Sequence, residues 1–482
     1  MRAPCAAVAL IFPVSAAAHG FGRLYNLPVP FWLYAWAASS ALLLSFLLVG
    51  YFAAAPAAPA TAVSRKLSNT RWARALHRAL PVLQALSVLL LLLCIATGLF
   101  GNRDPFRNFS MTFFWVVFLL GFTYLTALIG NLYAAVNPWR VMSEALARPA
   151  QGRLRYPAWL GDWPALALYL LFIWFELFGM GRPQPLATLL LAYTALNFAG
   201  VWLVGTRAWF QHCEFFSVFL RLIALMAPLH YQRAESAGKR GTLQLRAPFA
   251  GLLQERPAGI STLVFALAML STTAFDGLRA TQWWVSLFWS DPSGLVTALA
   301  GTHPMRAYAS LRPWYIGWET FWLLASPFIY LAVYLACIAL ARQLTRSPRT
   351  LRELALDFGY SLLPIALVYH LTHYATLMLT QGLKIISLSS DPFGWGWDLF
   401  GTAMLLRAPI LPGMGLVWHA QVGLILLGHI VSVVIAHRIA LRVLPTRRQA
   451  LLSQLPMLLL MVLFTVAGLW IIAQPLTVER MR

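Results

Sequence analysis

The stretch IALVYHLTHYATLML, residues 365–379, has the apolar composition of a membrane-spanning helix, yet it carries two histidines, His370 and His373. Residues at positions i and i+3 share one face of an α-helix, so both imidazoles are expected on the same side. Ionisable groups are costly inside a bilayer and usually face the interior of a helix bundle or a wet cavity. The stretch therefore predicts a transmembrane helix that contributes to a buried site.

The rest of the chain has the composition of an integral membrane protein. Of its 482 residues, 60% are hydrophobic and 11% are charged, whereas soluble domains are about a quarter charged. Apolar runs of roughly 20 residues, the length that spans a bilayer, recur throughout. We expect an all-α fold, a polytopic transmembrane helical bundle that forms one domain over residues 19–482. The ten expected spans are 30–53, 81–100, 112–136, 158–180, 187–204, 258–276, 315–341, 358–386, 411–437 and 456–474.

The first 18 residues have the features of a secretory signal peptide. Arg2 is a minimal positive region, residues 6–14 are apolar, and the small residues 16–18 fit the rule for signal peptidase. Cleavage would leave His19 as the mature N-terminus, where the free amine and the ring could together chelate copper. The alternatives are an uncleaved anchor and a His19 without a role.

The net charge of +21 comes mostly from short loops between the apolar runs, which argues against a nucleic-acid partner. Five loops hold 24 of the 36 Lys and Arg residues: 54–80, 138–157, 205–257, 342–354 and 438–448. The positive-inside rule places these loops in the cytoplasm and both mature ends in the periplasm of a bacterial inner membrane. Within the third loop, residues 215–229 predict an interfacial or re-entrant helix, with a short buried helix as the alternative.

Further histidines lie in the run 411–437: His419, His429 and His437. At a rise of about 1.5 Å per residue, the depths of His370 and His373 fall between those of His419 and His429. The two spans are consecutive, and adjacent elements usually pack together. We therefore predict one metal site in the periplasmic half of the bundle. Its expected ligands are His370, His373, His419 and His429, with His19 as a further candidate, whereas His437 is expected to face the lipid headgroups.

Carboxylates are expected near the same side of the membrane. Glu176, Asp276 and Glu319 lie at the periplasmic ends of their spans, and Asp391 and Asp398 lie in the loop between the two histidine-bearing spans. Asp391 or Asp398 could bridge a metal or accept a proton from water, so both are candidate catalytic residues. Imidazole and oxygen ligands suit a divalent transition metal, and Zn, Mn, Fe and Cu all remain open. The alternatives are separate hydrogen bonds between helices and a haem held by His370 and His429.

Several longer strings resemble one known family, the bacterial membrane proteins known as fenitrothion hydrolases. The resemblance runs from His19 to about Ala403. It rests on HGFGRLYNLPVPFWLYAW at the mature start, NLYAAVNPWR (131–140), TAFDGL (273–278), HLTHY (370–374) and SDPFGWGWDLFGTA (390–403).

This resemblance implies hydrolysis of the P–O–aryl bond of apolar organophosphorus triesters such as fenitrothion, with release of a nitrophenol. A histidine-bound metal would suit the reaction, because it activates water and polarises the phosphoryl group. The expected partners are the lipid bilayer and an apolar small molecule, and a second membrane subunit is left open. Two other classes also remain open: a copper- or haem-containing membrane oxidoreductase or metal-handling protein, and a proton-coupled transporter.

Overall fold

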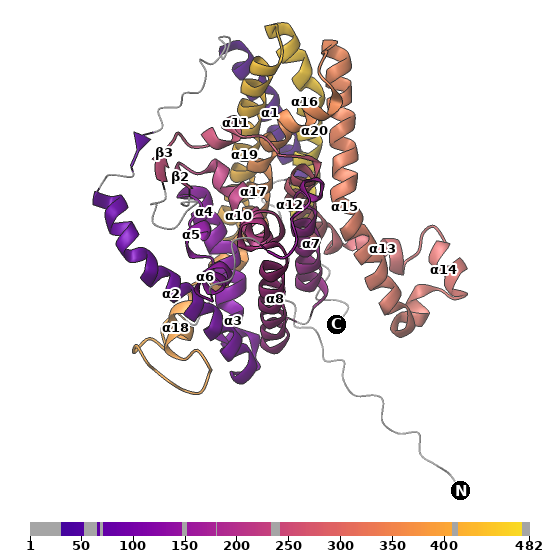
Figure 1. Ribbon diagram of the computed structural model, residues 1–482. Coiled ribbons are helices and arrows are strands. Elements are labelled where there is room, and N and C mark those ends of the chain that lie inside the picture. Colours follow the sequence, from indigo (N-terminus) through magenta and orange to yellow (C-terminus); the bar gives the residue numbers. More distant parts are fainter. Residues whose placement is uncertain are drawn as a thin grey trace.

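The computed structural model describes residues 30–52, 65–67, 71–146, 152–179, 181–232, 242–406 and 413–474. The signal-peptide prediction and His19 lie outside these residues. The described chain is an all-α bundle, and nine of its helices are long and apolar enough to cross a membrane (Figure 1). The predicted fold class is confirmed, and the protein is a multi-pass membrane protein.

The elements up to residue 254 alternate long helices with short helical turns. They are α1 (Phe31–Phe52), β1 (Arg65–Lys66), α2 (Arg71–Phe100), η1 (Pro105–Arg107), α3 (Phe109–Met111), η2 (Thr112–Phe122), α4 (Thr123–Leu128), α5 (Tyr133–Val136), α6 (Pro138–Ala145), η3 (Ala158–Leu160), α7 (Trp163–Phe178), α8 (Pro183–Val204), α9 (Thr206–Ala208), η4 (Trp209–Cys213), α10 (Phe215–Ile223), η5 (Ala224–Met226), β2 (Leu229–Gln232), β3 (Thr242–Leu245) and α11 (Ala250–Gln254).

The remaining elements include the longest helices. They are α12 (Ile260–Arg279), α13 (Gln282–Trp289), α14 (Leu295–Ala300), η6 (Pro304–Ala307), α15 (Tyr308–Thr345), α16 (Leu351–Gly359), η7 (Tyr360–Leu362), α17 (Leu363–Gln381), α18 (Lys384–Ser390), α19 (Met414–Val443) and α20 (Arg447–Ala473).

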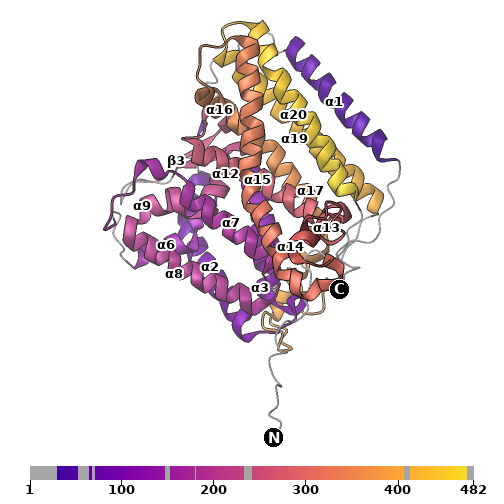
Figure 2. The ribbon, with the colours of Figure 1, turned by 90° about the vertical axis from the view of Figure 1, so that its right-hand side faces the viewer.

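Helix α12 is the centre of the bundle. Nearly all its residues are buried, and it packs against α7, α15, α17 and α20. Helices α1, α15, α19 and α20 run beside one another as long tilted rods, with α1 outermost (Figure 2). A helix that is apolar on every side must be surrounded by protein or lipid, and here protein surrounds it.

Two of the apolar segments are too short to span a bilayer as regular helices. The predicted span 158–180 contains α7, which has 16 residues, against the roughly 20 that a spanning helix needs. Helix α10 and turn η5 are almost wholly buried among their neighbours, which agrees with the alternative of a short buried helix and not with a helix lying at the membrane surface.

A small sheet, which the sequence did not predict, joins two of the basic loops. Strand β3 pairs antiparallel with β1 on one side and β2 on the other. Gly130, after α4, forms a bridge to Leu229 beside this sheet. Its φ is +153°, and a Cβ there would collide with the carbonyl of Leu229, so the close approach requires glycine.

The helix ends fall on two opposite faces. On the face with the basic loops, hereafter the basic face, Arg442 donates to the carbonyl of Leu253 at 2.6 Å and Gln449 donates to that of Thr345 at 2.9 Å. On the opposite face, the backbone N–H of Asn102 donates to the carbonyl of Phe393 at 2.8 Å. The loops predicted to share a side of the membrane therefore contact one another.

The predicted helix 112–136 begins as a π-helix. Element η2 continues for 11 residues before α4 restores the α-helical spacing. Its wider turns carry Phe113, Phe114, Phe118 and Phe122. Single π turns inside α-helices are frequent at functional sites, so the residues around this segment are candidates for such a site.

The arrangement of the loops predicts the sidedness of each face. We expect topology reporters fused after Leu146, Glu255 and Ser347 to report cytoplasm, because the positive-inside rule retains the basic loops there. Reporters fused after Ser293 and Gly396 should report the periplasm. The opposite set of signals from both groups would overturn this orientation.

Candidate functional site

The half-buried His373 contacts the buried Asp276 where α17 crosses α12. Nε2 of His373 lies 2.8 Å from Oδ2 of Asp276. A carboxylate only accepts hydrogen bonds, so Nε2 is the protonated nitrogen of this ring. The other edge of the ring faces Gly277, where a Cβ would lie 3.5 Å from Cε1 of His373. The same Cβ would lie only 2.6 Å from Cγ2 of Ile471, so the small residue beside Asp276 lets α20 approach α12.

Tyr374, the next residue on α17, connects this pair to a second carboxyl group. Its hydroxyl lies 3.1 Å from Oδ2 of Asp276 and 3.4 Å from Oε1 of Glu176 on α7. One hydroxyl hydrogen can serve only one of these two acceptors at a time. Two carboxylates this close repel each other in a low-dielectric interior, so the cluster favours a bound proton, cation or polarised water between them.

His370 faces the same cluster from one turn earlier on α17. Its ring lies 4.9 Å from that of Tyr374, and its Nδ1 lies 3.3 Å from the hydroxyl of Tyr124 on α4. Phe219 of the buried helix α10 packs beside it, with ring centroids 6.4 Å apart. The expectation that His370 and His373 turn toward one buried region agrees with these contacts.

A small cavity lies inside this cluster. Its polar lining comes from Glu176, Asp276, His370 and Tyr374, together with Tyr169, Thr272 and Thr273. The volume open to the centre of a water molecule is about 20 Å³, and one water needs about 10–15 Å³. The cavity can therefore hold a single water or a small ion against two carboxyl groups and an imidazole.

The rest of the cavity is lined by apolar side chains. Its remaining lining residues are Leu119, Phe172, Ile173, Leu177, Phe215, Phe216 and Phe219. Beyond them, Arg279 at the end of α12 forms an ion pair with buried Glu319, with N–O distances of 3.3 Å. Polar interactions strengthen where water is excluded, so this position makes the cluster a candidate site for chemistry.

The histidines of α19 do not join the cluster. His419 is exposed, and its Nδ1 lies 2.6 Å from the carbonyl of Gly415. His429 is buried, and its Nδ1 lies 2.8 Å from the carbonyl of Ile425. Helix α19 packs on another face of α17, where Gly428 meets Val368. The depths estimated from the sequence contain no information on the direction in which each ring points.

The positions of these histidines can be compared with the predicted metal site. Within the described residues, no three His, Cys, Asp or Glu side chains are placed to hold one metal ion. The four predicted ligands therefore do not form a shared site in the described chain. Binding of Zn, Mn, Fe or Cu, including any by His19, stays a prediction, and no catalytic step is derived from it.

Three other sequence predictions concern residues outside the cluster. Asp391 accepts the backbone N–H groups of Trp395 and Gly396, at 2.9 and 2.8 Å. Asp398 accepts that of Ala403 at 2.9 Å. Both carboxylates thus organise the loop after α18, and neither lines the cavity. His437, expected at the headgroups, is instead 1% exposed and lies 2.9 Å from the amide nitrogen of Gln454.

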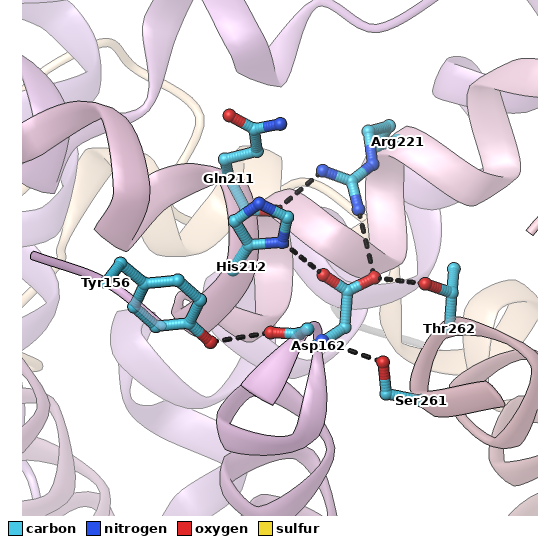
Figure 3. Close-up of polar contacts among 8 residues, drawn as sticks. Tyr156, Asp162, Gln211, His212, Arg221, Ser261 and Thr262 are labelled. Atoms are coloured by element: carbon cyan, nitrogen blue, oxygen red, sulfur yellow. Dashed lines mark hydrogen bonds and ion pairs between the residues drawn. The ribbon is translucent and has the colours of Figure 1, made fainter. Parts of the chain in front are cut away.

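A second polar cluster, which sequence reasoning missed, lies near the basic face (Figure 3). Asp162, just before α7, accepts from Nδ1 of His212 at 2.7 Å and from the hydroxyl of Thr262 at 2.6 Å. Arg221 lies 3.4 Å from the same carboxylate, and the ring of Tyr156 stacks on His212 with centroids 5.4 Å apart. These contacts join α7, η4, α10 and α12.

The charge of Asp162 is set by these partners. Burial raises the pKa of this carboxyl, but the hydrogen bond from His212 and the charge of Arg221 outweigh burial and hold the pKa below its usual value. The carboxylate is therefore ionised at neutral pH and anchors the short helix α7. The only sequence signal was an acidic residue before an apolar run, which is common at helix starts.

Comparison with known proteins does not assign the chain to a family. No protein-family model, no curated protein and no solved structure matches the chain.

The contacts of Asp162 predict that this residue makes a pH-dependent contribution to the stability of the fold. Asp162→Asn should lower the free energy of unfolding by about 2 kcal/mol at neutral pH, since hydrogen bonds to a charged group contribute about 1.5–3 kcal/mol. A carboxyl whose pKa is lowered by folding stabilises the protein above its ordinary pKa, and this stabilisation is lost as the pH falls through the folded value.

Unfolding of the purified protein in detergent would measure this effect. The difference between wild type and Asp162→Asn should shrink below a pH of about 4, the ordinary pKa of Asp. The exposed Asp398→Asn serves as the control and should show a smaller loss at neutral pH. A difference that stays constant down to acidic pH would contradict the assignment.

Proposed function

We propose that this protein is a membrane-embedded hydrolase that cleaves the P–O–aryl bond of apolar organophosphorus triesters. The main support for the proposal is the water-sized cavity beside Glu176 and Asp276, which is otherwise lined by apolar side chains and whose Asp276 is held by His373. The family resemblance of the sequence supports the same reaction. An apolar ester partitions into lipid, and a site inside the bundle is reached from there.

The arrangement suggests a role for each side chain. Asp276 is already engaged by His373 and Tyr374, whereas the nearest hydrogen-bonding group to Glu176 is the tyrosine hydroxyl at 3.4 Å. Glu176 is therefore the better acceptor for a proton from the cavity water. A positioned carboxylate of this kind contributes about 10²–10⁴-fold to a rate as general base.

The reaction balances without a further reactant. Glu176 takes one proton from water as the oxygen attacks phosphorus, and the P–O–aryl bond breaks with departure of the nitrophenoxide. The imidazole of His370 supplies a hydrogen-bond donor toward the charge that develops on the phosphoryl or thiophosphoryl group. The cavity has room for the water alone, so the ester must displace apolar lining residues such as Ile173 and Leu177.

Nitrophenol release from fenitrothion by membranes that contain the protein tests this proposal. Glu176→Gln removes the base but keeps the size of the side chain, and it should lower the rate at least about 100-fold, the lower bound for loss of a general base. Asp276→Asn and His373→Ala should also lower it, because they release the neighbours that position the water.

Asp398→Asn is the matched carboxylate control and should keep the wild-type rate. Wild-type activity in Glu176→Gln, with the protein present at equal amounts, would refute the role of the cavity. A loss of activity in Asp398→Asn alone would instead indicate that Asp398, in the loop after α18, is the catalytic carboxylate.

A proton-coupled transporter is the second candidate, because the same cavity fits a water within a chain of carboxyl, hydroxyl and imidazole groups. Such chains carry protons through membranes. Proteoliposomes distinguish the two functions. Glu176-dependent acidification of their lumen without ester cleavage would favour the transporter, and ester cleavage without proton flux would favour the hydrolase.

A further inference from the structure

The loop after α18, residues 391–406, exposes several large apolar side chains. Phe400 is 70% exposed and Met404 is 76% exposed. The other large apolar side chains exposed in this loop are Trp395, Trp397, Leu399, Leu405 and Leu406. Exposed apolar side chains that gather in one short segment mark a surface that contacts a membrane or another protein. None of these residues lines the polar cavity, so the surface needs a separate explanation.

Hydrogen bonds inside the loop hold its backbone while these side chains face outward. The hydroxyl of Ser390, a buried residue at the end of α18, accepts the backbone N–H groups of Phe400 and Thr402 at 3.2 and 3.3 Å. Asp391 and Asp398 accept further N–H groups of the loop. Most N–H groups of the loop are thus donated within the protein. Lipid chains offer no hydrogen-bond partners, so a backbone held in this way is suited to contact with lipid.

The loop lies beside the point where α2 ends. Helix α2 is long and apolar enough to cross a membrane, and its last residue, Phe100, is 69% exposed. Two residues later, the N–H of Asn102 donates to the carbonyl of Phe393 at 2.8 Å, and a Cβ on Gly394 would lie 2.7 Å from that of Asn102. Figure 1 shows the loop below α18, projecting from the edge of the bundle. The exposed surface of the loop therefore adjoins the end of a membrane-spanning helix.

Charged and aromatic side chains limit how deep the loop can lie in a bilayer. Asp391 and Asp398 are the only charged residues at positions 391–406. Asp391 accepts two N–H groups of the loop, whereas Asp398 is exposed. An exposed carboxylate is costly among acyl chains, so Asp398 must stay where water reaches it. Trp395 and Trp397 are also exposed, and tryptophan is enriched at the level of the headgroups. These residues favour a position at the boundary between headgroups and acyl chains.

We propose that the loop 391–406 inserts into the leaflet opposite the basic face, with Phe400 and Met404 among the acyl chains and the two tryptophans at the level of the headgroups. The bilayer is favoured over a protein partner, because the loop adjoins the end of a spanning helix and its backbone donors need no partner from outside. The two aspartates then have a structural role, since they hold the loop in the form that contacts lipid. The proposal is independent of the hydrolase function, because the loop does not line the polar cavity.

Spin labels test the position of the loop. Phe400→Cys, Met404→Cys and Arg103→Cys are labelled separately in the full chain and reconstituted in nanodiscs of phosphatidylcholine and phosphatidylglycerol, and labelled wild type gives the background from the native cysteines. Power saturation then measures collisions with oxygen, which dissolves in lipid, and with a nickel chelate, which stays in water. Labels at Phe400 and Met404 should respond to oxygen and lose the response to nickel. The label at Arg103, an exposed polar position beside the loop, is the matched control and should respond to nickel.

Asp391→Ala tests how the loop is held. It removes the acceptor of two N–H groups in the loop, so a label at Met404 should become more mobile and gain a response to the nickel chelate. Asp104→Ala is the control for this variant. Asp104 also accepts a backbone N–H, that of Phe106 at 2.9 Å, but it lies outside the loop. The label at Met404 should therefore behave in Asp104→Ala as it does without this second substitution.

Two results would overturn the proposed insertion. A nickel response at Phe400 and Met404 as strong as that at Arg103 would place the loop in water. Labels at both positions that respond to neither oxygen nor nickel would show that protein covers the loop, either a second copy of this chain or another subunit. For the structural role of the aspartates, an unchanged label at Met404 in Asp391→Ala would show that the loop keeps its form without this carboxylate and would contradict that part of the proposal.

Discussion

A carboxylate on the most enclosed helix of the bundle must have polar partners, and this requirement explains the arrangement around α12. An unpaired charge costs many kcal/mol in an apolar interior, so Asp276 needs hydrogen-bond donors from neighbouring helices. Helix α17 supplies two of them, His373 at 2.8 Å and the hydroxyl of Tyr374 at 3.1 Å. The same hydroxyl reaches Glu176, which brings α7 into the cluster. The crossing of these three helices is the position of the proposed site.

Composition and charge placement were enough to predict the helical membrane fold, because bilayer length and loop charge are simple physical limits. They also predicted that His370 and His373 lie in a buried polar region. The pairing of His373 with Asp276 could not be predicted, since the two residues are 97 positions apart and residue spacing says nothing about how two helices are rotated against each other. The same limit explains why depth alone grouped His419 and His429 with His370 and His373, although their rings do not lie together.

The π-helix η2 is the element that relates the two cavities. Its phenylalanines line an apolar cavity beside α2, and its Leu119 lines the polar cavity. Phe114 and Phe118 contact Phe216 with ring centroids 6.4 and 5.2 Å apart, so aromatic rings separate the two spaces. Sequence patterns gave no sign of the π-helical spacing, which departs from the 3.6-residue period that such patterns detect.

The interaction between Asp276 and His373 is the central claim, and a double-mutant cycle measures it most directly. The free energies of unfolding of wild type, Asp276→Asn, His373→Ala and the double variant would be compared in the same detergent. A buried hydrogen bond to a charged group predicts a coupling energy of about 1.5–3 kcal/mol. Additive effects, with a coupling energy below about 0.5 kcal/mol, would show that the two side chains act separately and would contradict the site built on their contact.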